Sequence, residues 1–391
     1  MYPEQRLPVS LITGFLGSGK TTLLNRLLRD PALADCAVVV NEFGEIGLDH
    51  ALIESSNDNT ILLSSGCLCC TVRGDLVDTL RDLSVKRMRG EVPPFSRVII
   101  ETTGLADPAP ILHTLMSLPV TRRYALASVV STVDAVNGEA TLGSQPESVK
   151  QAAVADRIVI TKTDLTGAAR IASLRARLAA LNPAADILDG ASALLPSQLF
   201  GALSYDPAAR SVDVSEWLRA EAYATQGADH ACADDEVPEH VAPDPNRHDD
   251  RVRAHCFTFD APLPWRELSI WLDVLVRLRG DDLLRVKGMV NVEGASGPVV
   301  VHAVQQLFHP PVELDAWPAA GEFADRRSRI VFITRDMARE DIARALDGVR
   351  DGFAEALRAA RGVEEIAARG VEDTAARGLE DVAARGEATN P

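Results

Sequence analysis

The chain has 391 residues, of which 46% are hydrophobic and 25% charged, and its formal net charge at pH 7 is −16. This composition is typical of a globular protein, and the length exceeds the roughly 100–200 residues of one domain, so we expect two domains. The excess of acidic residues repels phosphate backbones and anionic lipid, which argues against nucleic acid and membranes as partners.

The first ten residues, MYPEQRLPVS, contain no basic segment followed by an apolar run. The sequence therefore predicts no secretory signal and a cytoplasmic protein. Of the six cysteines, Cys67, Cys69 and Cys70 lie within four consecutive positions. In a reducing compartment such a cluster indicates metal or redox chemistry rather than a disulfide framework.

Residues 1–203 are predicted to form an α/β domain with a mainly parallel sheet. Short, continuous apolar runs alternate here with helical stretches, which is the pattern of a parallel sheet covered by helices on both faces. The expected strands are Val9–Ile12, Ala37–Val40, Ile61–Leu63, Arg97–Ile100, Leu126–Val133 and Arg157–Ile160.

Residues 204–252 are predicted to be an acidic linker, because the alternation stops there and the composition becomes strongly acidic. A smaller α+β domain is expected over residues 253–350, with elements in the order β-α-β-β-β-α. These elements are Ala254–Asp260, a helix with its apolar stripe between Trp265 and Leu275, Leu283–Val292, Pro298–His309, Arg329–Thr334 and a helix over Arg339–Val349.

Residues 351–391 contain an eight-residue repeat, RGVEEIAA, RGVEDTAA and RGLEDVAA. This period matches neither the seven nor the eleven residues of supercoiled helices, and each glycine costs a helix about 1 kcal/mol. We expect an exposed, weakly helical tail. A helix that docks on a partner is the alternative.

A phosphate-binding loop follows the first predicted strand. The segment from Gly14 to Thr21, GFLGSGKT, matches G-x-x-x-x-G-K-[ST] and precedes a helical segment. In such a loop backbone N–H groups surround a phosphate, the lysine reaches the outer phosphates and the hydroxyl binds Mg²⁺. The predicted nucleotide-binding residues are Gly14, Gly17, Ser18, Gly19, Lys20, Thr21 and Thr22.

A carboxylate is expected opposite this loop. The apolar strand Arg97–Ile100 leads into Glu101, and a strand that delivers an acid to the Mg²⁺ shell is the usual companion of a phosphate-binding loop. We predict that Lys20, Thr21 and Glu101 serve catalysis, with Thr21 and Glu101 at Mg²⁺. A solvated glutamate is the alternative for Glu101. Gly104 is a candidate backbone donor to the terminal phosphate.

The choice of base depends on the segment from Thr161 to Asp164, TKTD, which follows the last predicted strand. It resembles the [N/T]KxD signature of GTPases, with Lys162 and Asp164 at the guanine base. The carboxylate accepts two hydrogen bonds from guanine, whereas adenine presents an acceptor there, so Asp164 favours GTP. A helix-capping role is the alternative for Asp164.

The cysteine cluster is the second strong signal. Cα atoms of adjacent residues lie about 3.8 Å apart, which is shorter than most disulfides span, so Cys69 and Cys70 are poor disulfide partners. Thiolates are soft ligands that favour Zn²⁺, Co²⁺, Ni²⁺ or Cu⁺ over Mg²⁺ and Ca²⁺. Cys67 and Cys69 share one side of an extended chain and Cys70 the other, so either the chain turns or two thiolates bind with a carboxylate. Redox or buried core thiols remain the alternative.

Five motifs in this order resemble the CobW-type family of metallochaperone GTPases. They are GFLGSGKTT (Gly14–Thr22), NEFGEIGLD (Asn41–Asp49), GCLCC (Gly66–Cys70), ETTGLADPAP (Glu101–Pro110) and TKTDL (Thr161–Leu165), followed by RVKG (Arg285–Gly288) and HAVQQLFHPP (His302–Pro311). The resemblance implies a GTPase domain joined to a smaller C-terminal domain. It also implies slow GTP hydrolysis that gates delivery of a metal to a client protein.

The resemblance implies a transition-metal site made of Cys67, Cys69, Cys70 and Glu45. Some relatives carry an acidic residue immediately before Asn41, where this chain has Val40. Many members have dense histidines between the domains. Here the linker has only His230, Cys232, His240 and His248, which are expected to be solvated, with metal recruitment as the alternative; His302 and His309 are expected to be sheet residues.

The favoured hypothesis is a GTPase, converting GTP to GDP and phosphate with Mg²⁺, that loads a metal into a client metalloprotein. Zn²⁺ is the expected metal. A Co²⁺ carrier for cobalamin synthesis or nitrile hydratase activation is one alternative, and a nucleotide-gated thiol sensor or scaffold is another. Assembly into a homo-oligomer is left open.

Overall fold

The computed structural model of the protein describes residues 6–41, 61–65, 72–200, 251–308, 311–318 and 323–352. The chain divides into two compact units, Met1–Pro264 with Val276–Ala338, and Trp265–Leu275 with Arg339–Pro391. Most of the predicted linker and tail, together with His309, Glu45 and the three clustered cysteines, lies outside the described residues.

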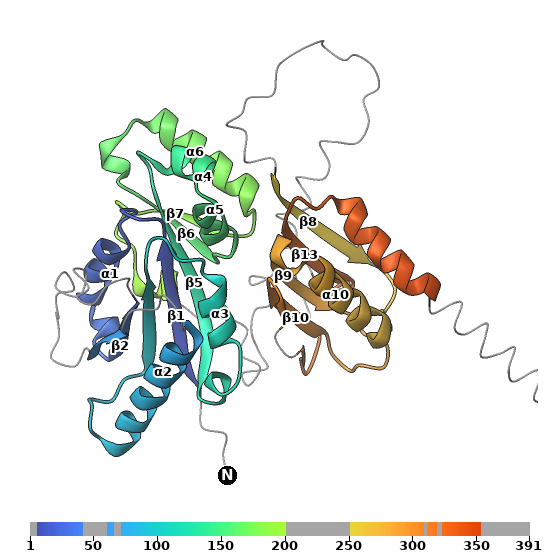
Figure 1. Cartoon of the computed structure of the whole chain (residues 1–391), viewed down its shortest axis with the longest axis horizontal. Helices are drawn as coiled ribbons and strands as arrows, with labels where there is room; N and C mark the ends of the chain where they lie inside the picture. Colours follow the sequence, from blue (N-terminus) through green and yellow to red (C-terminus); the bar gives the residue numbers. More distant parts are fainter. Residues whose placement is uncertain are drawn as a thin grey trace, which may run out of the picture. The chain divides into compact units, whose positions relative to one another are not determined.

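The first unit contains an α/β fold whose sheet has seven strands within the described residues, in the order β3-β2-β4-β1-β5-β6-β7 (Figure 1). All neighbouring pairs run parallel, which confirms the predicted fold class. Each of the six predicted strands is present, and β7 at the edge is an addition. The strands are β1 (Leu7–Gly14), β2 (Cys36–Asn41), β3 (Ile61–Ser65), β4 (Arg97–Thr102), β5 (Tyr124–Asp134), β6 (Arg157–Thr161) and β7 (Asp186–Asp189).

Helices cover both faces of this sheet. Val9 and Leu11 of β1 pack with leucines of α2 and α3, whereas Ile12 packs with leucines of α1 on the opposite face. Ile158 of β6 packs with leucines of α6 on the α2 face. Successive strand residues point to opposite faces, so a continuous apolar strand supplies both layers. The helices are α1 (Lys20–Leu28), α2 (Val72–Arg89), α3 (Ala109–Leu115), α4 (Gly138–Ser144), α5 (Pro146–Ala153), α6 (Ala168–Leu181) and α7 (Pro196–Phe200), with 3-10 turns η1 (Pro31–Leu33), η3 (Val120–Arg122) and η4 (Thr163–Leu165).

The strand order decides where the predicted motifs meet. β4, β1, β5 and β6 are neighbours and parallel, so their carboxyl ends lie along one edge of the sheet. The last residues of these strands and the loops that follow them contain the phosphate loop, Glu101 and the segment 161–164. Ligands of open α/β sheets bind at this edge, so the fold brings motifs far apart in sequence to one place.

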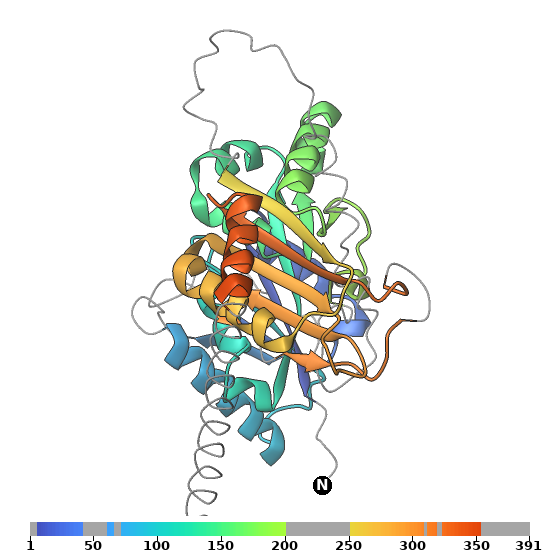
Figure 2. The ribbon, with the colours of Figure 1, turned by 90° about the vertical axis from the view of Figure 1, so that its right-hand side faces the viewer.

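An antiparallel sheet follows in the C-terminal part. Its order within the described residues is β11-β10-β9-β13-β8, and β12 also pairs with β10. Figure 2 gives a second view of these strands, coloured yellow to orange-red. The strands are β8 (Val252–Phe259), β9 (Leu283–Val290), β10 (Val299–Val304), β11 (Leu307–Phe308), β12 (Val312–Glu313) and β13 (Ser328–Arg335).

The prediction of one strand over Pro298–His309 is wrong. The chain reverses between β10 and β11, and Val304 pairs with Leu307 across the two-residue turn. Gln305 has a φ of 49°, which lies in the left-handed region that such tight hairpins require. The turn contains no glycine or asparagine and interrupts an apolar alternation, so the sequence pattern hid it. His302 lies in β10, as expected.

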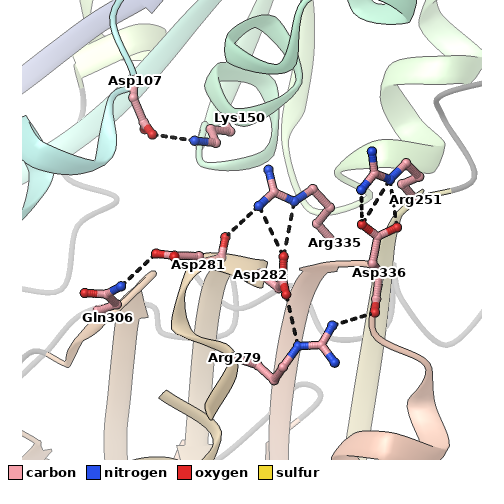
Figure 3. Close-up of polar contacts among 9 residues, drawn as sticks. All are labelled: Asp107, Lys150, Arg251, Arg279, Asp281, Asp282, Gln306, Arg335 and Asp336. Atoms are coloured by element: carbon pink, nitrogen blue, oxygen red, sulfur yellow. Dashed lines mark hydrogen bonds and ion pairs between the residues drawn. The ribbon is translucent and has the colours of Figure 1, made fainter. Parts of the chain in front are cut away.

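Charged side chains connect the ends of three elements in this sheet (Figure 3). Asp282, in the 3-10 turn η6 (Gly280–Asp282), accepts hydrogen bonds from Arg279 at 3.0 Å and from Arg335 of β13 at 3.2 Å. Arg251, beside β8, donates from Nε to both carboxylate oxygens of Asp336, at 2.9 and 3.0 Å. These contacts hold the turn before β9 against the end of β13.

The second unit contains the apolar stripe of α10 (Trp265–Arg279) and the helix at 339–352, both of which were predicted. Trp271 is fully buried, and its Nε1 donates to the carbonyl oxygen of Ile342 at 3.1 Å. The carboxylate of Glu267 lies 3.5 Å from Arg350. Among the helices of the described residues, none has the length and apolar composition needed to cross a bilayer.

Candidate functional site

The phosphate loop connects β1 to α1 through backbone conformations that favour glycine. Gly19, the residue before α1, has a φ of 88°, in the left-handed region. It is followed by the free N–H groups of the first helical turn, so the loop directs backbone donors toward one point. Two side chains brace the loop: Ser18 Oγ lies 2.6 Å from Thr132 Oγ1, and Thr161 Oγ1 donates to the Ser18 carbonyl at 2.7 Å.

Lys20 and Thr21 open helix α1 beside Glu101. Thr21 Oγ1 donates to Glu101 Oε1 at 2.6 Å, and the Glu101 side chain belongs to a residue only 2% exposed. Glu101 reaches this position because β4 pairs in register with β1, with Glu101 opposite Ile12. The Lys20 ammonium donates to the carbonyl oxygen of Phe15 at 3.3 Å, so it lies over its own loop. A hydroxyl and a carboxylate in contact offer the hard oxygen donors that Mg²⁺ prefers.

Gly104 lies against the phosphate loop. A Cβ atom at this position would meet Leu16 Cα at 2.5 Å and Leu16 N at 2.6 Å, so the close approach requires glycine. The hydroxyl of Thr102, two residues earlier, donates to Thr13 Oγ1 at 3.0 Å. The loop after β4 is therefore adjacent to the loop after β1, where a terminal phosphate would lie.

A cavity of about 540 Å³ opens beside the phosphate loop. Of the residues predicted to bind nucleotide, Gly19, Thr22, Lys162 and Asp164 line it. Asp164 is exposed, so its carboxylate is accessible to a ligand in the cavity. The remaining lining residues are Leu23, Arg26, Thr161, Leu165, Gly190 and Ala191.

The far wall of this cavity comes from residues that the sequence analysis did not identify. The loop after β7 contributes Gly190 and Ala191, and Arg26 NH1 of α1 donates to the Gly190 carbonyl at 2.5 Å. Asp189 fixes the loop, because its Oδ1 accepts from Thr163 Oγ1 at 2.7 Å and from the Ala191 N–H at 2.9 Å. The hydrogen bond from Thr163 lowers the pKa of Asp189 below its usual value. The small residues Gly190 and Ala191 directly after β7 were the available sequence signal for this loop.

Asp134 is a second residue that was missed. Lys162 Nζ lies 2.7 Å from Asp134 Oδ2, at the end of β5. Burial alone would raise the pKa of Asp134, but hydrogen bonds from Lys162, the Val136 N–H and Asn137 outweigh it, and the pKa is lowered. Lys162 has a φ of 56°, so the TKTD segment has an unfavourable backbone conformation at this lysine.

Comparisons with known proteins agree with this geometry. Residues 8–189 match the family described as CobW/HypB/UreG, nucleotide-binding domain, and residues 252–350 match the cobalamin synthesis protein cobW C-terminal domain. The zinc chaperone YjiA of Escherichia coli is 31% identical over 346 residues, which cover 88% of this chain and 99% of that protein. The chain belongs to the CobW family.

One further relative of this CobW-family protein and a solved structure of YjiA also cover most of the chain. The zinc chaperone CobW of Pseudomonas aeruginosa is 28% identical over 379 residues, covering 87% of this chain and 91% of that protein. The crystal structure of Zn(II)-bound YjiA GTPase from E. coli has a TM-score of 0.63 and 27% identity, covering 88% of this chain and 99% of that chain. The resemblance predicted from the motifs is confirmed.

The predicted metal ligands of this CobW-family chain, Cys67, Cys69, Cys70 and Glu45, lie outside the described residues. Within the ranges that the structure describes, no three His, Cys, Asp or Glu side chains gather in a way that could hold a metal ion. Cys36 is fully buried in the sheet, and burial raises the pKa of its thiol to about 11. A thiol in this environment stays protonated and is a poor ligand.

Proposed function

We propose that this protein is a GTPase that binds Zn²⁺ as cargo and delivers it to a client metalloprotein. The observation that carries the proposal is the hydrogen bond from Thr21 Oγ1, in the first turn of α1, to Glu101 Oε1 at 2.6 Å. The following residues of α1 line the cavity that Asp164 also lines. This arrangement suits a nucleoside triphosphate with its metal ion. The names of the two full-length relatives, both zinc chaperones, support zinc as the cargo.

The proposed reaction is GTP + H₂O → GDP + phosphate. The N–H groups of Gly17 and Gly19 hold the phosphates, and Gly14 allows the loop to leave β1. The Ser18 N–H, which donates to the Phe15 carbonyl at 3.0 Å, would exchange that contact for a phosphate oxygen. Lys20 exchanges its contact with the Phe15 carbonyl for the outer phosphates. Mg²⁺, when bound, would supply positive charge that offsets the negative charge developing on the phosphate oxygens. Thr21 and Glu101 are the residues that would hold it.

Guanine is proposed to occupy the 540 Å³ cavity. Asp164 would accept hydrogen bonds from the edge of the base, and Lys162 would lie against its face. Thr22 and the Gly190–Ala191 loop close the cavity, and Arg26 tethers that loop to α1. Discrimination against adenine follows because an adenine acceptor would face the Asp164 carboxylate.

Cys67, Cys69, Cys70 and Glu45 are proposed as the Zn²⁺ ligands. Three thiolates and a carboxylate supply the soft and borderline donors of a zinc site, and such thiolates persist in a reducing cytoplasm. We propose residues 1–203 as the GTPase domain, 204–252 as linker, 253–350 as C-terminal domain and 351–391 as tail.

The test is whether the nucleotide controls the affinity for Zn²⁺. Competition with a chromophoric chelator would measure Zn²⁺ affinity for the nucleotide-free, GDP-bound and non-hydrolysable-GTP-bound protein, with Cys69→Ala as the control for the site. Coupling is reciprocal, so a GTP state that binds zinc tighter must itself be favoured by zinc, typically 5–150-fold. Equal zinc affinity in the three states would overturn delivery, and equal binding of ATP and GTP would overturn the guanine assignment.

A further inference from the structure

Gln151 of α5 is a buried amide that contacts the loop after β4. Its residue is 1% exposed, and Nε2 donates to the Gly104 carbonyl at 3.3 Å and to the Ala106 carbonyl at 3.0 Å. Its Oε1 has no hydrogen-bond partner among the described residues. The amide therefore contributes only donation here, and both of its donor contacts go to one loop.

The neighbouring residue on α5 holds the same loop at a second point. Lys150 Nζ lies 2.6 Å from Asp107 Oδ2, and the two side chains point toward one another in Figure 3. The other oxygen of Asp107 accepts from the Ala109 N–H at 3.0 Å, at the start of α3. Consecutive residues of α5 thus attach to the beginning and the end of the loop 104–107.

The front of this loop faces the phosphate site. Gly104 lies so close to the Leu16 backbone that a Cβ atom could not fit between them. Gly104 is therefore enclosed between the phosphate loop on one side and Gln151 on the other. With its carbonyl oxygen held by Gln151, the peptide groups around Gly104 have a defined orientation relative to the phosphate loop.

Helix α5 is itself a fixed support. The side-chain amide of Asn182 donates to the carbonyl oxygens of Ala152, Ala153 and Ala155 at 2.9, 3.1 and 2.8 Å. Asn182 is 2% exposed, so these bonds are shielded from water. These hydrogen bonds hold the end of α5 that follows Gln151 in a fixed position. Gln151 can therefore hold the loop in place, because the helix that carries it does not move.

We propose that Gln151 is a positioning residue that holds the Gly104–Ala106 loop in the orientation that presents the Gly104 N–H to the γ-phosphate of GTP. The inference rests on the proposed GTPase function and adds a residue outside all of the sequence motifs. GDP lacks the γ-phosphate, so Gln151 sets the preference for GTP over GDP and not the affinity for the guanine or the inner phosphates.

The variant Gln151→Leu tests this inference. It removes the hydrogen bonds that Gln151 donates to Gly104 and Ala106, and no accepted hydrogen bond is lost. Affinity for GDP stays within about twofold of wild type, because the phosphate loop and the base cavity are untouched. The preference for a non-hydrolysable GTP analogue over GDP falls about tenfold, which corresponds to ~1.4 kcal/mol and matches the net contribution of one or two neutral hydrogen bonds. Gln151→Met provides an unbranched second variant should leucine disturb folding.

Gln145→Leu is the matched control. Gln145 precedes the same helix, and its side chain makes no capping hydrogen bond. The same chemical change there leaves the GTP preference at the wild-type value. Thermal unfolding of all three variants checks that the fold is retained.

A second readout does not depend on nucleotide. Hydrogen exchange of the amides from Gly104 to Asp107, measured in the nucleotide-free full chain, becomes about tenfold faster in Gln151→Leu and stays at wild type in Gln145→Leu. Unchanged exchange in Gln151→Leu overturns the inference even if the protein is a GTPase. Faster exchange with an unchanged GTP preference reduces Gln151 to a structural tether and overturns it as well. If wild type binds no guanine nucleotide, the proposed function fails, and the exchange data still decide whether Gln151 holds the loop.

Discussion

The ammonium group of Lys162 lies 2.7 Å from Oδ2 of Asp134, so a carboxylate at the end of β5 holds the lysine of the TKTD loop. Asp134 is 8% exposed and its pKa is lowered, so its carboxyl group is ionised at neutral pH. Asp134→Asn keeps the shape and removes the charge. We expect affinities for GDP and GTP to fall together by about fivefold to tenfold, since Lys162 is proposed to contact the guanine that both nucleotides share.

Titration calorimetry with both nucleotides would measure this effect. The half-buried Asp30, whose carboxylate caps η1, offers Asp30→Asn as a control with wild-type affinity. An unchanged GDP affinity in Asp134→Asn would show that the ion pair does not hold Lys162 for binding.

Asp164→Asn should change the base that is accepted. The amide presents a donor in place of one of the two carboxylate acceptors, so guanine loses one of its two proposed hydrogen bonds and the altered edge of xanthine gains a partner. We expect GTP affinity to drop by at least tenfold and affinity for xanthosine triphosphate to rise. Competition between the two nucleotides for the same site measures the exchange, and a variant that loses both equally would contradict the assignment.

The motifs that could be predicted are those in which one short segment carries its own chemistry. Gly14–Thr21 and Thr161–Asp164 follow apolar strands, and parallel pairing brings their loops to one edge. Gln151 was not predictable, because its contact with Gly104 joins residues 47 positions apart through a helix that carries no motif.

The failure to predict strand β7 from the sequence has a different cause. β7 reads DILD, and its residues are only half-buried or exposed, because it lies at the edge of the sheet. An edge strand needs no continuous apolar run, so the hydrophobic pattern that revealed the central strands is weak there. The Gly190 loop that follows it was missed for the same reason.

Removing the carboxylate of the buried ion cluster in the first unit should lower the free energy of unfolding by a large amount. Asp156 Oδ1 accepts from Arg285 at 2.6 Å and from Lys287 at 3.0 Å, and all three side chains are at most 8% exposed. Burial alone would raise the pKa of Asp156, but the two cations outweigh it and the pKa falls far below its usual value. Asp156→Ala leaves two buried cations without their anion, so we expect a loss of about 3–5 kcal/mol.

Urea unfolding followed by fluorescence would measure the loss. Asp78→Ala is the control, because Asp78 lies 4.0 Å from Arg81 with both side chains more than 70% exposed, and such pairs contribute little. Equal stability of the two variants would mean that water reaches Asp156 in solution.

Alkaline pH should destabilise the protein through Cys36. Burial raises the pKa of this thiol from 9.0 to about 11, so above pH 9 the unfolded chain releases a proton that the folded chain keeps. The stabilisation is complete below pH 9 and is lost as the pH rises to 11, at up to about 1.4 kcal/mol per pH unit. Cys36→Ala lacks this term, so its stability should fall less steeply between pH 9 and 11 than that of wild type. Parallel curves would show that the thiol ionises freely in the folded protein.

Gly104→Ala should separate GTP binding from GDP binding most sharply. The new Cβ would lie 2.5 Å from Leu16 Cα, and backbone atoms on both sides cannot yield as a flexible side chain could. The loop must therefore move away from the phosphate loop, which removes the Gly104 N–H from the proposed position of the γ-phosphate and leaves the proposed sites of the inner phosphates and the base unchanged. We expect GTP hydrolysis to fall by at least a hundredfold, with GDP affinity within about threefold of wild type.

Gly167→Ala is the matched control, because no atom lies within 4 Å of a Cβ at that position, before α6. Single-turnover hydrolysis and GDP titration of both variants make the comparison, and wild-type hydrolysis in Gly104→Ala would place the loop after β4 outside the catalytic machinery.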